Sequence, residues 1–155
     1  MKVVIIGAGE QGFVLTWNLV KHPGVDEIVI ADYDESRAQD VATRVGAGKT
    51  TAVKIDARDV DAVAALAEGA ALIINAVLPE WDEPLMRAAL KAKCHYQDMA
   101  TRTVGGTVDD GLLMQMGMDA DFKAIGKTAL IHCGMTPGVT NTLAAIGYEE
   151  LDQCE

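Results

Sequence analysis

The sequence predicts an α/β fold, a doubly wound parallel sheet of six strands with helices on both faces. The first observation is a strict alternation, along the 155 residues, between short apolar runs and longer segments of helical period. The second is that most of the apolar runs are continuous aliphatic blocks rather than alternations of apolar and polar residues. Strict alternation is typical of parallel strands joined by helical crossovers, and continuous blocks are typical of strands covered on both faces.

The expected elements follow one another without a linker or an internal repeat. Strands are expected over residues 2–6, 27–31, 51–55, 71–76, 94–98 and 128–133. Helices are expected over residues 11–21, 35–45, 60–67, 83–92 and 110–123, with a further helix that starts near residue 139. We expect residues 1–155 to form one domain, because this length suits a single core.

Capping residues support the helix boundaries. Glycine follows several of the expected helices, at residues 46, 69 and 126, where a left-handed residue commonly ends a helix. Asp34 can cap the second helix, and Asp82 with Pro84 suits the first turn of the fourth. Thr136 is expected to cap the last helix, with Pro137 at its first position.

A glycine-rich turn follows the first expected strand and opens the first helix. Gly7 permits a tight turn, Gly9 lets the backbone approach a pyrophosphate, and Gly12 lets the helix pack closely on the strand. The backbone N–H groups at the helix start, around Glu10 and Gln11, would then face the diphosphate with the positive end of the helix dipole. The pattern predicts a Rossmann fold with strand order 3-2-1-4-5-6 and a dinucleotide site.

Asp32 bears on the choice of cofactor. It lies 20 residues after Gly12, at the end of the second strand, where a carboxylate accepts hydrogen bonds from the adenosine ribose. A 2′-phosphate beside this carboxylate would meet like-charge repulsion, so NAD is favoured over NADP. Arg37 keeps NADP possible because it could reach a 2′-phosphate; the alternative is a solvated side chain that pairs with Asp34.

Two further strand ends supply candidate cofactor residues. Asp56 would lie near the adenine, or it could cap the third helix together with Asp59. Asn75 could offer its amide to the nicotinamide ribose, or it could simply close the strand into a turn. Ala76 and Val77, which follow it, are small enough to leave room for the middle of the cofactor.

Asp98 is the single candidate for a catalytic role. It ends the fifth strand and shares a strand face with Tyr96, so it would lie near a nicotinamide ring. A general-base or orienting role is conceivable there. A lone carboxylate without a visible partner is more often structural, however, so the catalytic residues stay unassigned.

Composition and charge exclude several classes of protein. Half of the residues are hydrophobic, which excludes a disordered chain. With 13 basic and 23 acidic residues the net charge is −10, which disfavours nucleic acid and anionic membranes as partners. The three cysteines are widely spaced, so neither a disulfide framework nor a metal site is expected. No apolar run is long enough to span a bilayer, and a cytoplasmic location is expected.

The strings at residues 74–79, 88–100 and 134–141 resemble the cofactor domain of the saccharopine dehydrogenase family. The opening residues 1–38 are similar to its lysine 6-dehydrogenase branch. The resemblance implies a nicotinamide-dependent oxidoreductase that acts on C–N bonds of amino acids or polyamine precursors. Its diagnostic loop contains Thr136, Pro137, Gly138 and Asn141, which we expect on the substrate side of the cofactor. Members carry a second domain, so the substrate domain is expected to be absent from these 155 residues through truncation.

An alternative function belongs to a different class of protein. A stand-alone NAD(H)-sensing regulatory domain of a transport system would share Gly7, Gly9, Gly12 and Asp32. Such a domain would not need the loop at residues 134–141, which favours the oxidoreductase. The expected partners are therefore a dinucleotide and a small amino-acid-like substrate, and a homodimer is possible.

Overall fold

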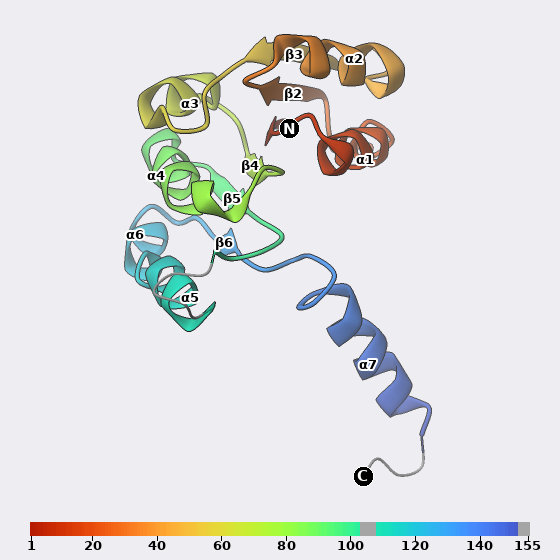
Figure 1. The fold of residues 1–155 in the computed structure, drawn as a ribbon, viewed down its shortest axis with the longest axis vertical. Coiled ribbons are helices and arrows are strands. Elements are labelled where there is room, and N and C mark those ends of the chain that lie inside the picture. Colours follow the sequence, from red (N-terminus) through yellow and green to blue (C-terminus); the bar gives the residue numbers. More distant parts are fainter. Residues whose placement is uncertain (103–107, 152–155) are drawn as a thin grey trace.

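A parallel six-stranded sheet organises the chain (Figure 1). The computed structural model describes residues 1–102 and 108–151. Its strands run in the order β3-β2-β1-β4-β5-β6, and every neighbouring pair is parallel. The strands are β1 Lys2–Ile6, β2 Glu27–Asp32, β3 Thr50–Lys54, β4 Leu72–Asn75, β5 His95–Gln97 and β6 Ala129–Leu130. The predicted fold class and strand order are confirmed.

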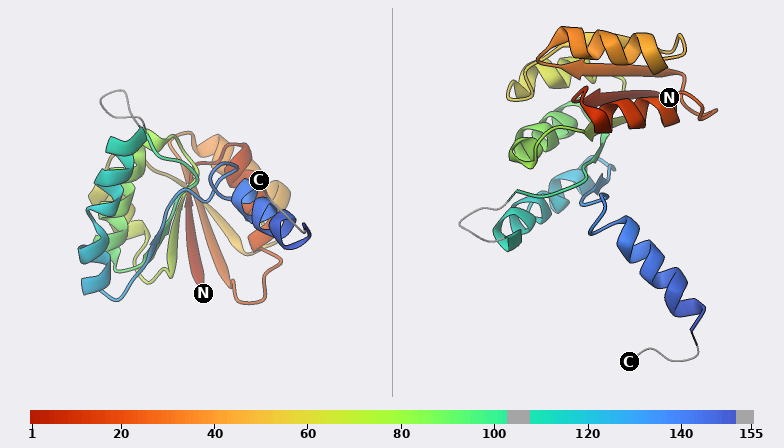
Figure 2. Two further views of the ribbon diagram at one scale, coloured as in Figure 1. Left: turned by 90° about the horizontal axis from the view of Figure 1, so that it is seen from below. Right: turned by 45° about the vertical axis from the view of Figure 1, so that its right-hand side comes forward.

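Helices cover both faces of this sheet (Figure 2). They are α1 Glu10–Leu19, α2 Glu35–Val45, α3 Val60–Leu66, the short 3₁₀ turn η1 Pro79–Trp81, α4 Asp82–Ala92, α5 Val108–Met116, α6 Asp119–Ala124 and α7 Val139–Glu149. The first two helices pack on one face, and α3 to α6 pack on the other, while α7 extends away from the body (Figures 1 and 2). None of the helices in residues 1–102 and 108–151 has the length and apolar character needed to cross a bilayer.

The aliphatic blocks are buried on both sides, as the sequence pattern predicts. Val3 and Ile5 of β1 point into the core under α1 and α2, whereas Val4 and Ile6 point into the core under α3 and α4. All four side chains are at most 1% exposed. One strand therefore serves two cores, because successive side chains leave a strand on opposite faces.

Two elements differ from the expectation. The helix expected over residues 110–123 is two helices, α5 and α6, and the break turns both Met118 and Phe122 into the core. The last strand stops at Leu130 because His132 adopts a left-handed conformation, with φ of 60°. The His132 N–H donates to the side chain of Asp98 at 2.7 Å instead of to a strand neighbour.

The expected caps are confirmed at one helix and wrong at another. Asp34 accepts a hydrogen bond from the Ser36 N–H and caps α2. Thr136 does not cap α7, because Gly138 precedes the helix and Pro137 stays outside it. With φ of 131°, Gly138 turns the chain immediately before the first helical residue, so the helix starts later than the Thr-Pro pattern predicts.

We predict that Lys93→Gly stabilises the protein by about 0.5–1 kcal/mol. Lys93 follows α4 in the left-handed conformation, with φ of 55°, and its side chain is exposed. A glycine there removes the steric cost of the β-carbon, and urea denaturation measures the gain. Lys93→Ala is the matched control, because it keeps the β-carbon and should bring no gain. A loss of stability in Lys93→Gly would contradict the inference that the β-carbon of Lys93 strains the backbone.

Candidate functional site

The glycine turn between β1 and α1 needs two of its glycines for its own shape. Gly7 has φ of 110°, and its N–H donates to the Ala31 carbonyl oxygen at 2.7 Å. A β-carbon on Gly12 would lie 1.9 Å from the Gly7 carbonyl oxygen, which is a backbone clash. Both glycines are therefore fixed by the folding of the turn, with or without a ligand.

Gly9 has no such reason to be glycine. Its φ of −76° and ψ of −164° suit any residue, and a β-carbon placed on it would meet no atom within 4 Å. The residue precedes α1, and no side chain within residues 1–102 and 108–151 caps this helix. The turn thus leaves an open cradle in front of the backbone N–H groups of Glu10 and Gln11, which suits a diphosphate.

Asp32 ties this turn to the second strand. Its carboxylate is 7% exposed, and Oδ2 accepts a hydrogen bond from the Ala8 N–H at 2.7 Å. The other oxygen, Oδ1, accepts from the Asp34 N–H at 2.9 Å. The sequence predicted only a ribose contact for Asp32 and did not indicate its hydrogen bond to the backbone of the glycine turn. A carboxylate has about four acceptor positions, so capacity remains for a ribose diol.

A hollow of about 690 Å³ opens beside the turn, on the side of β2 and β3. Its walls include Gly7, Asp32, Asp56 and Val77. Asp59, not Asp56, caps α3 by accepting from the Ala62 N–H. Asp56 instead pairs with the Arg58 guanidinium, which lowers the pKa of that carboxyl to about 2. The hollow has the position expected for an adenosine, and the adenine contact of Asp56 stays a prediction.

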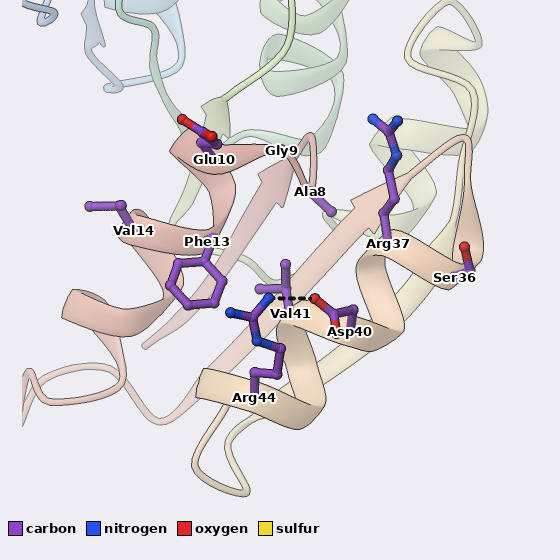
Figure 3. A pocket seen from close by; sticks show the side chains of 10 residues that line it. All are labelled: Ala8, Gly9, Glu10, Phe13, Val14, Ser36, Arg37, Asp40, Val41 and Arg44. Carbon is purple, nitrogen blue, oxygen red and sulfur yellow. Dashed lines mark hydrogen bonds and ion pairs between the residues drawn. The ribbon is translucent and has the colours of Figure 1, made fainter.

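A second hollow, of about 670 Å³, lies between α1 and α2 on the other side of Gly9 (Figure 3). Arg44 crosses it, with its guanidinium 4.8 Å from the Phe13 ring centre and 2.9 Å from the Asp40 carboxylate. Arg37 lies on its wall (Figure 3) and forms a loose pair with Asp34, at 3.6 Å. The pair corresponds to the solvated alternative for Arg37, and a contact with a 2′-phosphate stays a prediction.

The ends of β4 and β5 carry a buried polar cluster. Asn75, Asp82 and Tyr96 are each at most 2% exposed. The Asn75 amide nitrogen donates to Asp82 Oδ1 at 2.8 Å, and its carbonyl oxygen accepts from the Val77 N–H at 2.9 Å. Asn75 thus closes the strand into a turn, which is the second of its two interpretations, and a contact with the nicotinamide ribose stays a prediction.

Asp98 is buried and well partnered. One carboxylate oxygen accepts from the His132 N–H at 2.7 Å and the other from the Gln115 amide at 2.6 Å. Gln115 also lies 3.0 Å from the His132 ring through its amide oxygen. The carboxylate therefore joins β5, α5 and the end of β6. This arrangement favours the structural interpretation of Asp98, and its catalytic role stays a prediction.

Asp82 is the residue that sequence reasoning missed at this edge. Its position at the start of α4 indicates a first-turn acid, but the side chain turns inward and is 1% exposed. Burial raises the pKa of Asp82 to about 7; the Asp98 charge adds to the rise, and the hydrogen bond from Asn75 opposes it. Burial also raises the pKa of Asp98. No pattern in the local sequence indicates that Asp82 points inward.

The loop at residues 134–141 closes tightly against the end of β5. A β-carbon on Gly134 would lie 2.3 Å from the Met99 carbonyl oxygen, and one on Gly138 would lie 2.2 Å from the Gly134 carbonyl oxygen. The Gly138 N–H donates to the Asn141 side chain at 3.0 Å. Thr136 and Pro137 are exposed at the tip. The structure brings this loop to the same edge as Asp98, and its contact with a substrate stays a prediction.

Comparisons with known proteins place these features in a family. The model of the saccharopine dehydrogenase NADP-binding domain matches residues 3–130. Carboxyaminopropylagmatine dehydrogenase of Synechocystis is 33% identical over 146 residues, which are 93% of this chain and 37% of that protein. Quinate/shikimate dehydrogenase (NAD(+)) of Corynebacterium glutamicum is 40% identical over 76 residues, which are 48% of this chain and 25% of that protein. The chain thus spans well under half the length of these curated relatives.

Solved structures share the fold. Apo saccharopine dehydrogenase (L-Glu forming) from Saccharomyces cerevisiae has a TM-score of 0.76 at 15% identity, over 96% of this chain and 31% of that chain. GenD2 from gentamicin A biosynthesis, solved in complex with NAD, has a TM-score of 0.61 at 23% identity, over 84% of this chain and 34% of that chain. The family and the fold together assign an NAD(P) cofactor to the chain. None of these proteins supports a regulatory domain of a transport system.

We predict that Gly12→Ala lowers the free energy of unfolding by about 2–4 kcal/mol, because its β-carbon meets the Gly7 carbonyl oxygen. Gly9→Ala is the matched control: its β-carbon meets nothing, so its stability should stay within about 0.5 kcal/mol of the wild type. Urea denaturation of both variants checks the difference. Equal losses would contradict the separation of roles within the turn.

We also predict a pH-dependent gain in stability for Asp82→Asn. The folded-state pKa of Asp82, about 7, lies above its ordinary value of 3.8, so folding favours the protonated form. The wild type therefore loses this contribution as the pH rises through about 7, and the neutral variant does not. Between pH 5 and pH 8 the variant should gain about 1–3 kcal/mol on the wild type in urea denaturation. If the difference in stability between the variant and the wild type stays constant over this pH range, the raised pKa of Asp82 is contradicted.

Proposed function

The chain belongs to the saccharopine dehydrogenase family as an NAD(P)-binding domain, and we propose that it serves an oxidoreductase acting on a C–N bond of an amino acid or a related amine. The observation that carries the proposal is the open cradle at Gly9. Gly7 and Gly12 are needed by the turn itself, whereas Gly9 is open in front of a helix that no side chain caps. A diphosphate explains why this residue carries no side chain.

Different residues of this edge would bind different parts of the cofactor. Gly9 would leave room for the diphosphate, and the backbone N–H groups of Glu10, Gln11 and Gly12 would donate to it. Asp32 would accept from the adenosine ribose, and the hollow of about 690 Å³ would hold the adenine. The ends of β4 and β5 would hold the nicotinamide half. The bound nicotinamide supplies a hydride or accepts one, and this chain binds and orients it.

NAD is the proposed form of the cofactor, although the family description names NADP. The buried carboxylate of Asp32 already accepts from two backbone N–H groups and would lie beside the ribose. A 2′-phosphate would be repelled there. Arg37 is the cation that could offset this repulsion, and its pair with Asp34 is loose enough to exchange.

The substrate is proposed to meet the loop that carries Thr136, Pro137, Gly138 and Asn141. The name of carboxyaminopropylagmatine dehydrogenase indicates an amine, which supports a small amino-acid-like substrate here. Residues 1–155 are proposed to form the dinucleotide domain, and the rest of the substrate pocket is proposed to belong to a second domain. Support comes from relatives more than twice as long as the segment they share with this chain. A catalytic role for Asp98, a cytoplasmic location and a homodimer stay predictions.

The open cradle gives a direct test of cofactor binding. We predict that Gly9→Ala weakens NADH binding at least tenfold without destabilising the protein, because its methyl group occupies the space of the diphosphate. Titration of NADH fluorescence measures the affinity. Gly147→Ala in α7 is the matched control, since its β-carbon also meets no atom, and it should bind NADH as the wild type does. Unchanged binding in Gly9→Ala would remove the main support for the proposal.

The choice between the two cofactors is tested at Arg37. We predict that the wild type binds NADH more tightly than NADPH, because Asp32 repels a 2′-phosphate. Arg37→Ala should leave NADH affinity within about twofold, since no NADH group needs this guanidinium. Competition titrations with both nucleotides give the ratio. A wild type that prefers NADPH, and that loses this preference in Arg37→Ala, establishes NADP instead.

A further inference from the structure

A small cavity lies between the carboxyl ends of β4 and β5. Its volume is about 50 Å³, which is enough for one or two water molecules or a group of similar size. Its walls combine the apolar residues Val77, Pro79 and Met99 with the acidic residues Asp82 and Asp98. A small flat group with a polar end therefore fits it better than a sugar or a long chain.

Asp82 lines this cavity and has one carboxyl oxygen without a partner in the described part of the chain. The side chain is 1% exposed, and its Oδ1 takes hydrogen bonds from Asn75 at 2.8 Å and from Tyr96 at 3.4 Å. Among the residues that the structure describes, nothing donates to Oδ2, although this atom is fully buried. A buried carboxyl oxygen without a partner is costly, so a donor from outside the chain would be bound strongly here.

Asp98 does not compete for such a donor. Its two oxygens already accept from the His132 N–H and from Gln115, at 2.7 and 2.6 Å. The two carboxyl groups of the cavity thus differ: Asp98 holds the fold together, and Asp82 is left with one open position.

The cavity adjoins the glycine turn on the side away from Asp32. Asn75 joins Asp82 to the Val77 N–H, and the turn at Ala76 and Val77 touches Gly7. A β-carbon on Gly7 would lie 2.6 Å from the Ala76 carbonyl oxygen. Asp32 lies on β2, on one side of β1, and the cavity lies at β4 and β5, on the other. A dinucleotide whose adenosine meets Asp32 extends its nicotinamide half across the switch point to the cavity.

From this placement, which rests on the proposed function, we propose that the cavity receives the carboxamide of the nicotinamide ring and that its NH₂ group donates to Asp82 Oδ2. The carboxamide is the part of the nicotinamide half that is small and flat and carries a nitrogen donor. Val77, Pro79 and Met99 then supply apolar contact for the ring. The hydrogen bond is charge-assisted when the carboxyl is ionised.

The protonation state of Asp82 decides whether it can accept the amide proton. Burial raises its pKa to about 7, with Asp98 adding to the rise and Arg102 opposing it. The ionised carboxylate is the form that accepts from the amide NH₂. The titrations are therefore run at pH 8, above this pKa.

Three ligands separate the contact from a general effect on the fold. NAD⁺ carries the amide, 3-acetylpyridine adenine dinucleotide has a methyl ketone in its place, and ADP-ribose lacks the ring. Isothermal titration of the wild type and Asp82→Ala with each ligand gives six affinities. We expect Asp82→Ala to weaken NAD⁺ about tenfold and to change the other two ligands by less than about twofold.

Asn75→Ala is the matched control. It removes the partner of the Val77 N–H and also a donor to Asp82 Oδ1, so it should weaken ADP-ribose as well as NAD⁺, whereas Asp82→Ala should spare ADP-ribose. An equal loss of NAD⁺ and ADP-ribose in Asp82→Ala would show that Asp82 only maintains this turn, which overturns the proposal. An equal loss of NAD⁺ and the acetylpyridine analogue would exclude the amide as donor.

The wild type alone gives a second measurement, which no folding defect can obscure. It should bind NAD⁺ about tenfold more tightly than the acetylpyridine analogue, and equal affinities overturn the proposal. If neither NAD⁺ nor ADP-ribose binds the wild type, the proposed function itself fails. If NAD⁺ and ADP-ribose both bind but NAD⁺ binds no more tightly than the acetylpyridine analogue, only the assignment of the cavity to the carboxamide is contradicted.

Discussion

The hydrogen bond from the Ala8 N–H to the buried carboxylate of Asp32 is the constraint on which the cofactor edge depends. It joins two strands that pair in register, with Ile6 opposite Ala31, so the turn depends on the pairing of the sheet. A hydrogen bond to a charged group contributes about 1.5–3 kcal/mol. Without the Ala8 N–H, Asp32 Oδ2 would lose the donor that the turn provides. The glycine turn is thus a consequence of the pairing of β1 and β2 as much as of its own glycines.

Local signals in the sequence predicted the first half of the sheet well. Gly7 and Gly12 are required within a few residues of each other, and the aliphatic blocks follow from burial on both faces, so pattern and structure depend on the same contacts. The second half was harder to predict. Asp98 accepts hydrogen bonds from Gln115 and His132, which are 17 and 34 residues away along the chain. Local sequence patterns do not indicate contacts between residues so far apart. Packing between α4 and the sheet decides the inward turn of Asp82.

The two halves of the edge consequently use different means to form a surface. Around β1 to β3 the backbone N–H groups of the glycine turn are the donors, and the Asp32 carboxylate holds the turn in place. This arrangement requires little of the other side chains there. Around β4 to β6 buried side chains join elements that are distant in the chain, and the tight contact of Gly134 with Met99 adds the last loop.

The use of backbone N–H groups at α1 has a kinetic consequence for a chain with a net charge of −10. A dinucleotide is itself an anion, so the field of the whole protein opposes its approach, and the uncharged donors of the turn act only at contact distance. Added salt shortens the reach of that field to about 10 Å at 0.1 M. Salt therefore accelerates the encounter and leaves the short-range hydrogen bonds nearly unchanged, which is the opposite of the behaviour of a site that captures phosphate with lysine and arginine.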